Sequence, residues 1–179
     1  MHRLALIAAA FSLALLWAQD PFKSPETAAP YYPTPQVVVE KMLELGELKK
    51  GEKTYDLGSG DGRFVITAAR KYGAKAVGVE LDKKLVAESR AAIKRQNLEA
   101  SASIIDGNLF DQEYKDADLI TVYLLPVTNA KLSGFLEKQL KKGARVVCHD
   151  FEFQDWNPER TIEMEDQEGR AHTLFLYRR

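Results

Sequence analysis

The chain has 179 residues, 45% of them hydrophobic and 28% charged, which is enough for one domain with a single sizeable core. Its 25 basic and 26 acidic residues nearly cancel, so we expect no nucleic-acid partner bound through phosphate neutralisation. The single cysteine, Cys148, excludes an intramolecular disulfide and a cysteine-cluster metal site. Three scattered histidines show no ligand pattern, and we therefore expect no metal.

The N-terminal 19 residues are predicted to form a signal peptide or a signal anchor. A basic start precedes residues 4–18, which are almost entirely apolar. This run is shorter than the ~20 residues of a membrane span and suits the apolar region of a secretory signal. We therefore expect export or membrane attachment, with attachment at the cytoplasmic face as an alternative. Residues 20–35 hold five of the seven prolines and predict an extended linker.

Residues 36–179 are predicted to form one α/β domain in which strands and helices alternate. Helical patterns lie at 36–48, 64–72, 83–97 and 129–140, and strand-like runs lie at 53–57, 75–80, 102–106, 118–125, 144–148, 161–164 and 173–177. The alternation predicts a Rossmann-like fold with a mostly parallel twisted sheet of about seven strands and helices on both faces. The last two runs predict a C-terminal antiparallel hairpin. Thr34 is predicted to cap the first helix, with Pro35 at its first position.

The loop after the first predicted strand carries the strongest ligand signal. Residues 56–62 read Asp-Leu-Gly-Ser-Gly-Asp-Gly, and such a glycine turn permits positive φ and close approach to a ligand. The next strand ends at Glu80, about 20 residues further on, where a carboxylate can bind ribose hydroxyls. The spacing is G-x-G-x-G, and Asp56 and Asp61 would repel a pyrophosphate but attract a cation. These features favour S-adenosylmethionine (SAM), which carries an ammonium and a sulfonium group.

Several segments resemble motifs of the class I SAM-dependent methyltransferases. Residues 55–63 are similar to motif I of that class. A more specific resemblance is to a small protein-lysine N-methyltransferase family, which includes an archaeal broad-specificity enzyme and mitochondrial enzymes that modify the ATP synthase c-subunit and the adenine nucleotide translocase. The segments that carry this resemblance are 30–35, 77–80, 123–126, 145–151 and 156–158. The resemblance covers about residues 30–177, essentially the whole domain.

The resemblance implies a SAM site and assigns parts of the ligand to it. The implied cofactor-binding residues are Asp56, Gly58, Ser59, Gly60, Asp61, Gly62, Glu80 and Asn108. Residues 56–62 would hold the methionine part, with backbone amides facing its carboxylate and acids facing its ammonium. Glu80 would hold the ribose. Asn108 would meet the adenine edge, although it stands where many relatives have Asp, and a simple turn residue is the alternative.

The resemblance also implies methylation of a lysine amine by direct displacement, with Tyr123, Tyr31 and Thr34 as the expected catalytic residues. An aromatic rim favours the neutral amine by desolvation, and cation–π contacts can receive the ammonium form. Packing roles for the tyrosines are the alternative. His149 and Asp150 are expected to shape the substrate channel or to cap the next turn. We expect a monomer and a protein substrate with an accessible lysine, with membrane proteins among the candidates.

Two other functions remain open at this point. The same fold could methylate a small molecule or a nucleic acid, although the lack of a basic surplus and of an Asn-Pro-Pro-Tyr motif disfavours nucleic acid. The chain could also be a non-catalytic, membrane-tethered SAM-binding protein. The intact acids and glycines of the loop argue against loss of the cofactor site.

Overall fold

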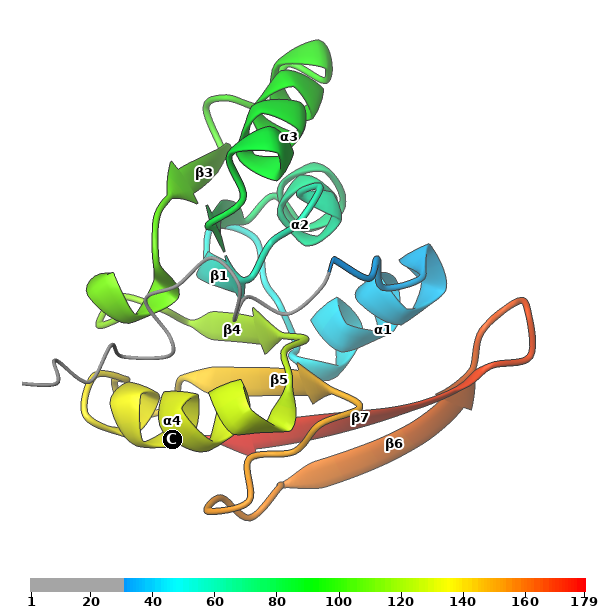
Figure 1. The fold of residues 1–179 in the computed structure, drawn as a ribbon, viewed down its shortest axis with the longest axis vertical. Coiled ribbons are helices and arrows are strands. Elements are labelled where there is room, and N and C mark those ends of the chain that lie inside the picture. The colour runs from blue at the N-terminus through cyan, green and yellow to red at the C-terminus, as the bar shows by residue number, and fades with distance from the viewer. Residues whose placement is uncertain (1–30) are drawn as a thin grey trace, which may run out of the picture.

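The computed structural model describes residues 31–179, which form a seven-stranded sheet with helices packed against it (Figure 1). The described elements are, in chain order, α1 (Gln36–Leu45), β1 (Lys53–Leu57), α2 (Arg63–Tyr72), β2 (Lys75–Glu80), α3 (Lys83–Arg95), β3 (Ala102–Asp106), the 3₁₀ helix η2 (Leu109–Asp111), β4 (Leu119–Val122), α4 (Pro126–Glu137), β5 (Arg145–His149), β6 (Arg160–Glu165) and β7 (Ala171–Arg178).

The strand order is β3-β2-β1-β4-β5-β7-β6, with β1 to β5 parallel and β7 antiparallel to both β5 and β6. The predicted sheet and its C-terminal antiparallel hairpin are therefore confirmed. Leu57 at the end of β1 pairs with Val79 on one side and Val122 on the other, so three strands end at one edge. The strand order reverses between β1 and β4. In open α/β sheets such a switch point is where ligands bind.

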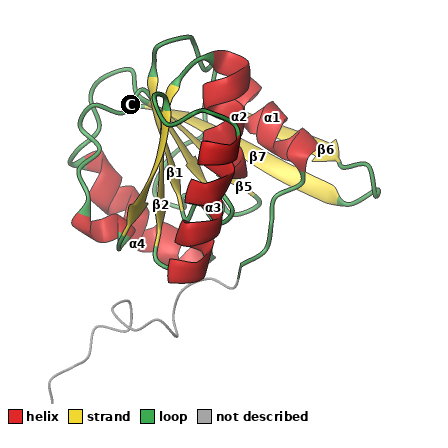
Figure 2. Cartoon of the chain, turned by 90° about the horizontal axis from the view of Figure 1, so that it is seen from above, coloured by secondary structure: helices red, strands yellow, loops and turns green. Residues whose placement is uncertain are grey.

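Helices cover both faces of the sheet, as Figure 2 shows from above. On one face, α1, α2 and α3 contribute buried apolar side chains such as Val38, Phe64 and Ile93 to the core. On the other face, α4 contributes Leu132 and Leu136. Each fully buried side chain of this size stabilises the fold by about 1.5–3 kcal/mol before entropy is counted. All four residues of β4 are buried because the strand is covered on both sides.

Several boundaries differ from the sequence pattern by one to three residues. Helix α4 begins at Pro126, because the fixed φ and missing N–H of proline suit the first turn of a helix. The predicted strand 118–125 therefore ends at Val122, and residues 123–125 connect β4 to α4. The first helix ends at Leu45 rather than at residue 48. Its N-cap is Pro35, without a side-chain cap, so the prediction that Thr34 caps it is wrong.

The expected localisation needs correction. No helix within residues 31–179 is long and apolar enough to cross a membrane. The predicted signal segment 1–19 and the linker up to residue 30 lie outside the described residues. The expectation of an exported or membrane-attached protein is therefore contradicted by the part of the chain that the structure describes.

Candidate active site

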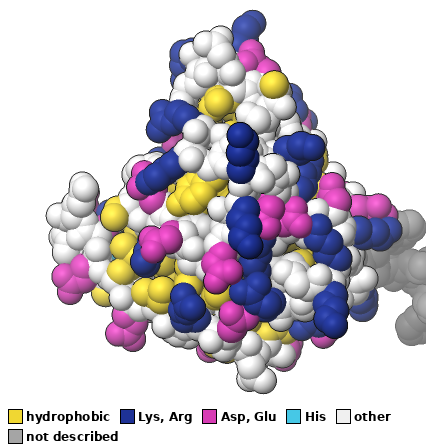
Figure 3. Space-filling model, turned by 180° about the vertical axis from the view of Figure 1, so that it is seen from behind, with side chains coloured by type: hydrophobic (Ala, Val, Ile, Leu, Met, Phe, Trp, Pro, Cys, Tyr) yellow, Lys and Arg dark blue, Asp and Glu magenta, His cyan; other side chains and the backbone are white. Residues whose placement is uncertain are grey.

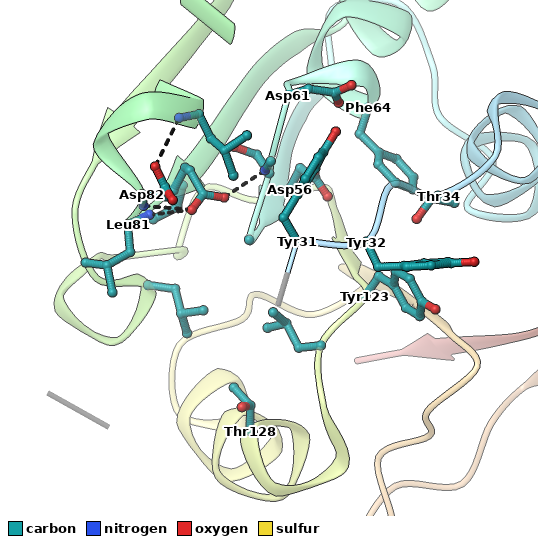
Figure 4. Close-up of a pocket in the computed structure, with 18 of the residues that line it drawn as sticks. Tyr31, Tyr32, Thr34, Asp56, Asp61, Phe64, Leu81, Asp82, Tyr123 and Thr128 are labelled. Atoms are coloured by element: carbon teal, nitrogen blue, oxygen red, sulfur yellow. Dashed lines mark hydrogen bonds between the residues drawn. The ribbon is translucent and has the colours of Figure 1, made fainter. Parts of the chain in front are cut away.

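A cavity of about 450 Å³ opens at the carboxyl edge of the sheet. It lies where β1, β2 and β4 end, and its volume is typical of sites for small molecules. The expected site residues that line it are Tyr31, Thr34, Asp56, Gly58, Ser59, Gly60, Asp61, Glu80, Asn108 and Tyr123. Figure 4 shows many of them around the cavity. Of the expected set, only Gly62 does not line it.

The loop between β1 and α2 needs its glycines for two separate reasons. Gly58, Gly60 and Gly62 have φ of 80°, 53° and 80°, in the left-handed region that side chains disfavour. A β-carbon at Gly58 would also lie 2.8 Å from the Leu124 side chain, and one at Gly60 would lie 2.8 Å from the ring of Tyr31. Gly62 is the N-cap of α2, so its role is to start the helix.

The backbone amides of this loop are already engaged within the protein. Gly58 and Ser59 both donate to the carbonyl of Val79, at 2.9 and 3.0 Å, and Gly62 donates to the carbonyl of Ser59 at 2.9 Å. Gly60 donates to Glu80 at 2.7 Å. The bonds to Val79 and Glu80 attach the loop to β2. Because all four amides already have acceptors, they are less available to face a ligand carboxylate, the role expected of them.

Glu80 ends β2 with a carboxylate that three backbone amides orient. Oε2 accepts from Gly60, and Oε1 accepts from Leu81 and Asp82 at 2.9 Å each (dashed in Figure 4). A carboxylate offers about four acceptor positions, so one remains for a hydroxyl donor in the cavity.

Two more carboxylates on the glycine loop differ in their environment. Asp56 is buried at the end of β1, where its Oδ1 accepts a hydrogen bond of 2.7 Å from the Thr121 hydroxyl. Burial raises the pKa of Asp56 to about 8; the negative charges of Glu80 and Asp61 act in the same direction, and the Thr121 bond opposes them. Burial also acts to raise the pKa of Asp61, but Arg63, at 2.6 Å, holds that pKa below its ordinary value.

Three tyrosines line the side of the cavity opposite Leu81 and Asp82 (Figure 4). Tyr31 and Tyr32 are largely exposed, whereas Tyr123 is half-buried immediately after β4. The ring centroid of Tyr123 lies 4.0 Å from that of His149, and the Tyr123 ring stacks on Phe151 at 6.3 Å. Burial raises the pKa of Tyr123, and Asp150 acts in the same direction, so its hydroxyl stays protonated at neutral pH.

Thr34 and Asn108 both have structural partners in addition to their place on the cavity wall. The Thr34 hydroxyl lies 3.4 Å from Nδ1 of His149, and its carbonyl accepts a 2.5 Å hydrogen bond from Arg63. The side-chain oxygen of Asn108 accepts from the backbone N–H of Phe110 at 2.9 Å and caps η2. Asn108 therefore has the turn role that was given as its alternative. The cap uses the oxygen, so the side-chain N–H₂ group is the part that can meet a ligand.

Sequence patterns alone miss several residues of the site. Asp82 lines the cavity while its side chain caps α3, and a cap signal before a helical pattern could have identified it. Leu125, Thr128 and Phe151 also line the cavity, but no local pattern marks them. Two of the histidines that look scattered in the sequence lie close together in the structure, with Nε2 of His149 at 2.9 Å from Nδ1 of His172.

Charge on the cavity wall matches a ligand with more positive than negative groups. The acids on the wall are Asp56, Asp61, Glu80 and Asp82. Arg63 is the only lysine or arginine that lines it among residues 31–179. SAM carries an ammonium, a sulfonium and one carboxylate, so its charges fit this wall, and its size fits the cavity.

Comparisons with known proteins agree with this geometry. The family model described as "ANTKMT methyltransferase domain" matches residues 56–160, more than half of the chain. A protein-lysine N-methyltransferase of Saccharolobus islandicus (strain REY15A) is 44% identical over 149 residues, which are 83% of this chain and 92% of that protein. An ATP synthase c-subunit lysine N-methyltransferase of Rattus norvegicus is 33% identical over 144 residues, which are 79% of this chain and 66% of that protein.

A solved structure extends the agreement to three dimensions. The crystal structure of an RNA methyltransferase from Salinibacter ruber in complex with S-adenosyl-L-homocysteine matches with a TM-score of 0.76 and 42% identity, covering 82% of this chain and 93% of that one. S-Adenosyl-L-homocysteine is what SAM becomes after it has given up its methyl group, so the predicted cofactor and fold class are supported together. The chain therefore belongs to the ANTKMT methyltransferase domain family of SAM-dependent methyltransferases.

Proposed function

We propose that this enzyme transfers a methyl group from SAM to the side-chain amine of a lysine in a protein substrate. One observation carries the proposal: a single cavity joins an acidic glycine loop, suited to a cationic cofactor, to a wall with three tyrosines, suited to an alkyl amine. The names of the 44% and 33% identical relatives, both lysine N-methyltransferases, support it.

We assign the cofactor to the half of the cavity formed by the glycine loop, Glu80 and Asn108. When bound, SAM supplies a methyl group on a sulfonium, a good leaving group. Asp56 stabilises the ammonium, and Arg63 faces the carboxylate. Glu80 accepts from a ribose hydroxyl at its remaining acceptor position, and the N–H₂ group of Asn108 donates to the adenine edge.

SAM affinity is expected to rise with pH between about 6 and 8. Because burial raises the pKa of Asp56 to about 8, the free enzyme carries a neutral Asp56 at pH 7, and a cation beside it must drive out that proton. Binding at pH 7 should therefore release close to one proton, measurable by calorimetry in buffers of different ionisation enthalpy. Asp56→Asn should abolish the proton release. A wild-type affinity that does not change over this pH range would contradict the assignment.

The three tyrosines of the cavity wall present a neutral lysine amine to the methyl group. A lysine has a pKa of about 10.4 in water, so it must lose a proton before it can attack. Tyr31, Tyr32 and Tyr123 surround the amine with aromatic surface, which lowers its pKa by desolvation. Their ring faces also attract the ammonium form on arrival. The C–N bond then forms as the C–S bond breaks, and sulfur keeps the electron pair.

Removal of the Tyr123 ring should impair use of the lysine substrate and leave cofactor binding intact. The ring, which packs on His149 and Phe151, contributes about 0.5–2 kcal/mol by a cation–π contact, so Tyr123→Ala should lower kcat/KM for the protein substrate roughly 2- to 30-fold. Tyr123→Phe keeps the ring and should retain most of the activity. Equal losses in both variants would instead assign the role to the hydroxyl, and a weakened Kd for SAM would place Tyr123 in the cofactor half.

The proposal is tested by mass spectrometry of a methylation assay with the full chain. SAM would be offered with a panel of lysine-rich proteins, including the ATP synthase c-subunit, the substrate named for the rat relative. Mass gains in methyl steps that map to lysine and disappear in Glu80→Ala would support the proposal. The c-subunit arm tests the further expectation of a membrane-protein substrate, and light scattering tests that of a monomer.

RNA is the second candidate substrate, because the 42% identical structure is described as an RNA methyltransferase. The near-neutral charge of the chain weighs against it, and Figure 3 shows basic and acidic side chains interspersed over one whole face of the molecule. The same assay should therefore include a structured RNA pool. Methyl transfer to RNA without transfer to any protein would replace the proposal.

A further inference from the structure

We infer that His149, Asp150 and His172 form a binding site for a divalent transition-metal ion of the zinc type, beside the active-site cavity. These three residues bring one donor atom each within 4.8 Å of one another, and they are the one such group found in residues 31–179. The sequence alone predicts no metal, because these two histidines are 23 positions apart.

The distances among the three donor atoms suit a metal ion. Nε2 of His149 lies 2.9 Å from Nδ1 of His172, and Oδ2 of Asp150 lies 3.4 Å from the first nitrogen and 3.9 Å from the second. A tetrahedral ion with bonds of about 2.0–2.2 Å separates its ligands by roughly 3.3–3.6 Å. The mean separation here falls in that range, so small side-chain rotations complete the geometry. Two imidazoles and one carboxylate favour zinc and its neighbours over magnesium or calcium.

Each donor residue is oriented by a contact on its other side. Nε2 of His172 lies 3.3 Å from Oδ2 of Asp166, and Nδ1 of His149 lies 3.4 Å from the Thr34 hydroxyl. Histidine ligands of metals usually have such a partner on the second ring nitrogen, which fixes the tautomer and the ring. Oδ1 of Asp150 accepts from the backbone N–H of Thr173 at 3.0 Å, which leaves Oδ2 for the ion.

The backbone places the donors together across two strands. His149 ends β5 and pairs with Leu174 of the antiparallel β7, so His172 lies just beyond it along the ladder. Asp150 follows with φ of 59°, an uncommon left-handed conformation for a residue other than glycine. Both histidines are buried, whereas the side chain of Asp150 is 28% exposed, so an ion can reach the site from that side.

A bound ion would fasten the substrate wall to the C-terminal hairpin. Tyr123 packs its ring on His149, and Thr34 contacts the same imidazole from the N-terminal segment. The ion would hold this imidazole against β7. Its role is therefore one of positioning, separate from the SAM half of the cavity.

The test is zinc titration of the metal-free, tag-free full chain by calorimetry, followed by cobalt substitution. We expect one Zn²⁺ per chain, a higher melting temperature with zinc, and visible absorption bands of tetrahedral Co²⁺. His172→Gln should weaken zinc binding more than tenfold, and so should Asp150→Asn. The matched control is His2→Gln, which removes the third histidine of the chain and should bind zinc like the wild type.

Three results would overturn the inference. Absence of zinc binding at millimolar concentration would mean that the histidines are only hydrogen-bonded to each other. Unchanged affinity in both site variants would locate the ion elsewhere. An intense near-ultraviolet cobalt–thiolate band would assign it to Cys148. Because His172 is buried, folding of each variant is checked by circular dichroism without zinc, and the partly exposed Asp150→Asn decides the matter if His172→Gln is unfolded.

Discussion

Replacing Glu80 by alanine is expected to weaken SAM binding about 10- to 150-fold. Hydrogen bonds to a charged group contribute about 1.5–3 kcal/mol, and this loss gives that change in Kd. The variant would also leave the Gly60 amide without its acceptor at 2.7 Å and would free the glycine loop from the end of β2. Fold stability should change less than affinity, because the other loop amides still bond to Val79.

The change in Kd is measured by calorimetric titration of the Glu80→Ala variant with SAM. The matched control is a substitution on α3, the helix that follows β2. Glu88 is an exposed glutamate on α3 whose ion pair with Lys84 is long, at 3.9 Å. Glu88→Ala should bind SAM like the wild type. A Kd for Glu80→Ala within twofold of the wild type would exclude a hydrogen bond from the ribose to this carboxylate.

Replacing Gly78 by alanine is expected to destabilise the fold by about 1–3 kcal/mol, the usual range for overpacking a core. Gly78 lies inside β2, directly under the glycine loop. An added β-carbon would lie 2.4 Å from the Ser59 hydroxyl oxygen and 2.7 Å from a methyl group of Ile104. Because Ser59 belongs to the loop itself, relief of this clash should displace the loop and also weaken SAM binding.

Urea denaturation of the two alanine variants Gly78→Ala and Gly134→Ala measures this effect. Gly134 lies inside α4, and a β-carbon there would meet nothing within 4 Å. Gly134→Ala should therefore stabilise the protein by about 0.4–1 kcal/mol, because alanine restricts the unfolded chain. If both variants were stabilised alike, the close packing of the loop on β2 would be wrong.

The sheet and the glycine loop could be predicted because their signals are local. The apolar pattern of the strand at residues 53–57 and the glycines and acids of the turn that follows it lie within a few positions of each other. The predicted start of α4 is too late because a proline often marks a boundary, whereas here it opens the helix. The roles assigned to Tyr123, Tyr31 and the cofactor residues stay predictions until the ligands are bound.

Contacts that depend on strand register could not be predicted. His149 and His172 meet only because β7 pairs antiparallel with β5 in one particular register. The local sequence favours Thr34 as the cap of the helix next to it, yet its hydroxyl lies near His149, 115 positions away. In both cases the partner comes from a distant part of the chain, and no periodicity in the sequence carries that information.

The segment 31–34 supplies part of the binding site without adding a strand or a helix to the fold. Tyr31, Tyr32 and Thr34 line the cavity, yet all three precede α1 and take no part in the strand ladders. The segment is held by Arg63, which donates to the Thr34 carbonyl, by Arg170, which donates to the Tyr32 hydroxyl at 2.8 Å, and by contact of the Thr34 hydroxyl with His149 of β5. A fragment that begins at α1 would contain the residues of every strand and helix described here, but it would lack one wall of the binding site.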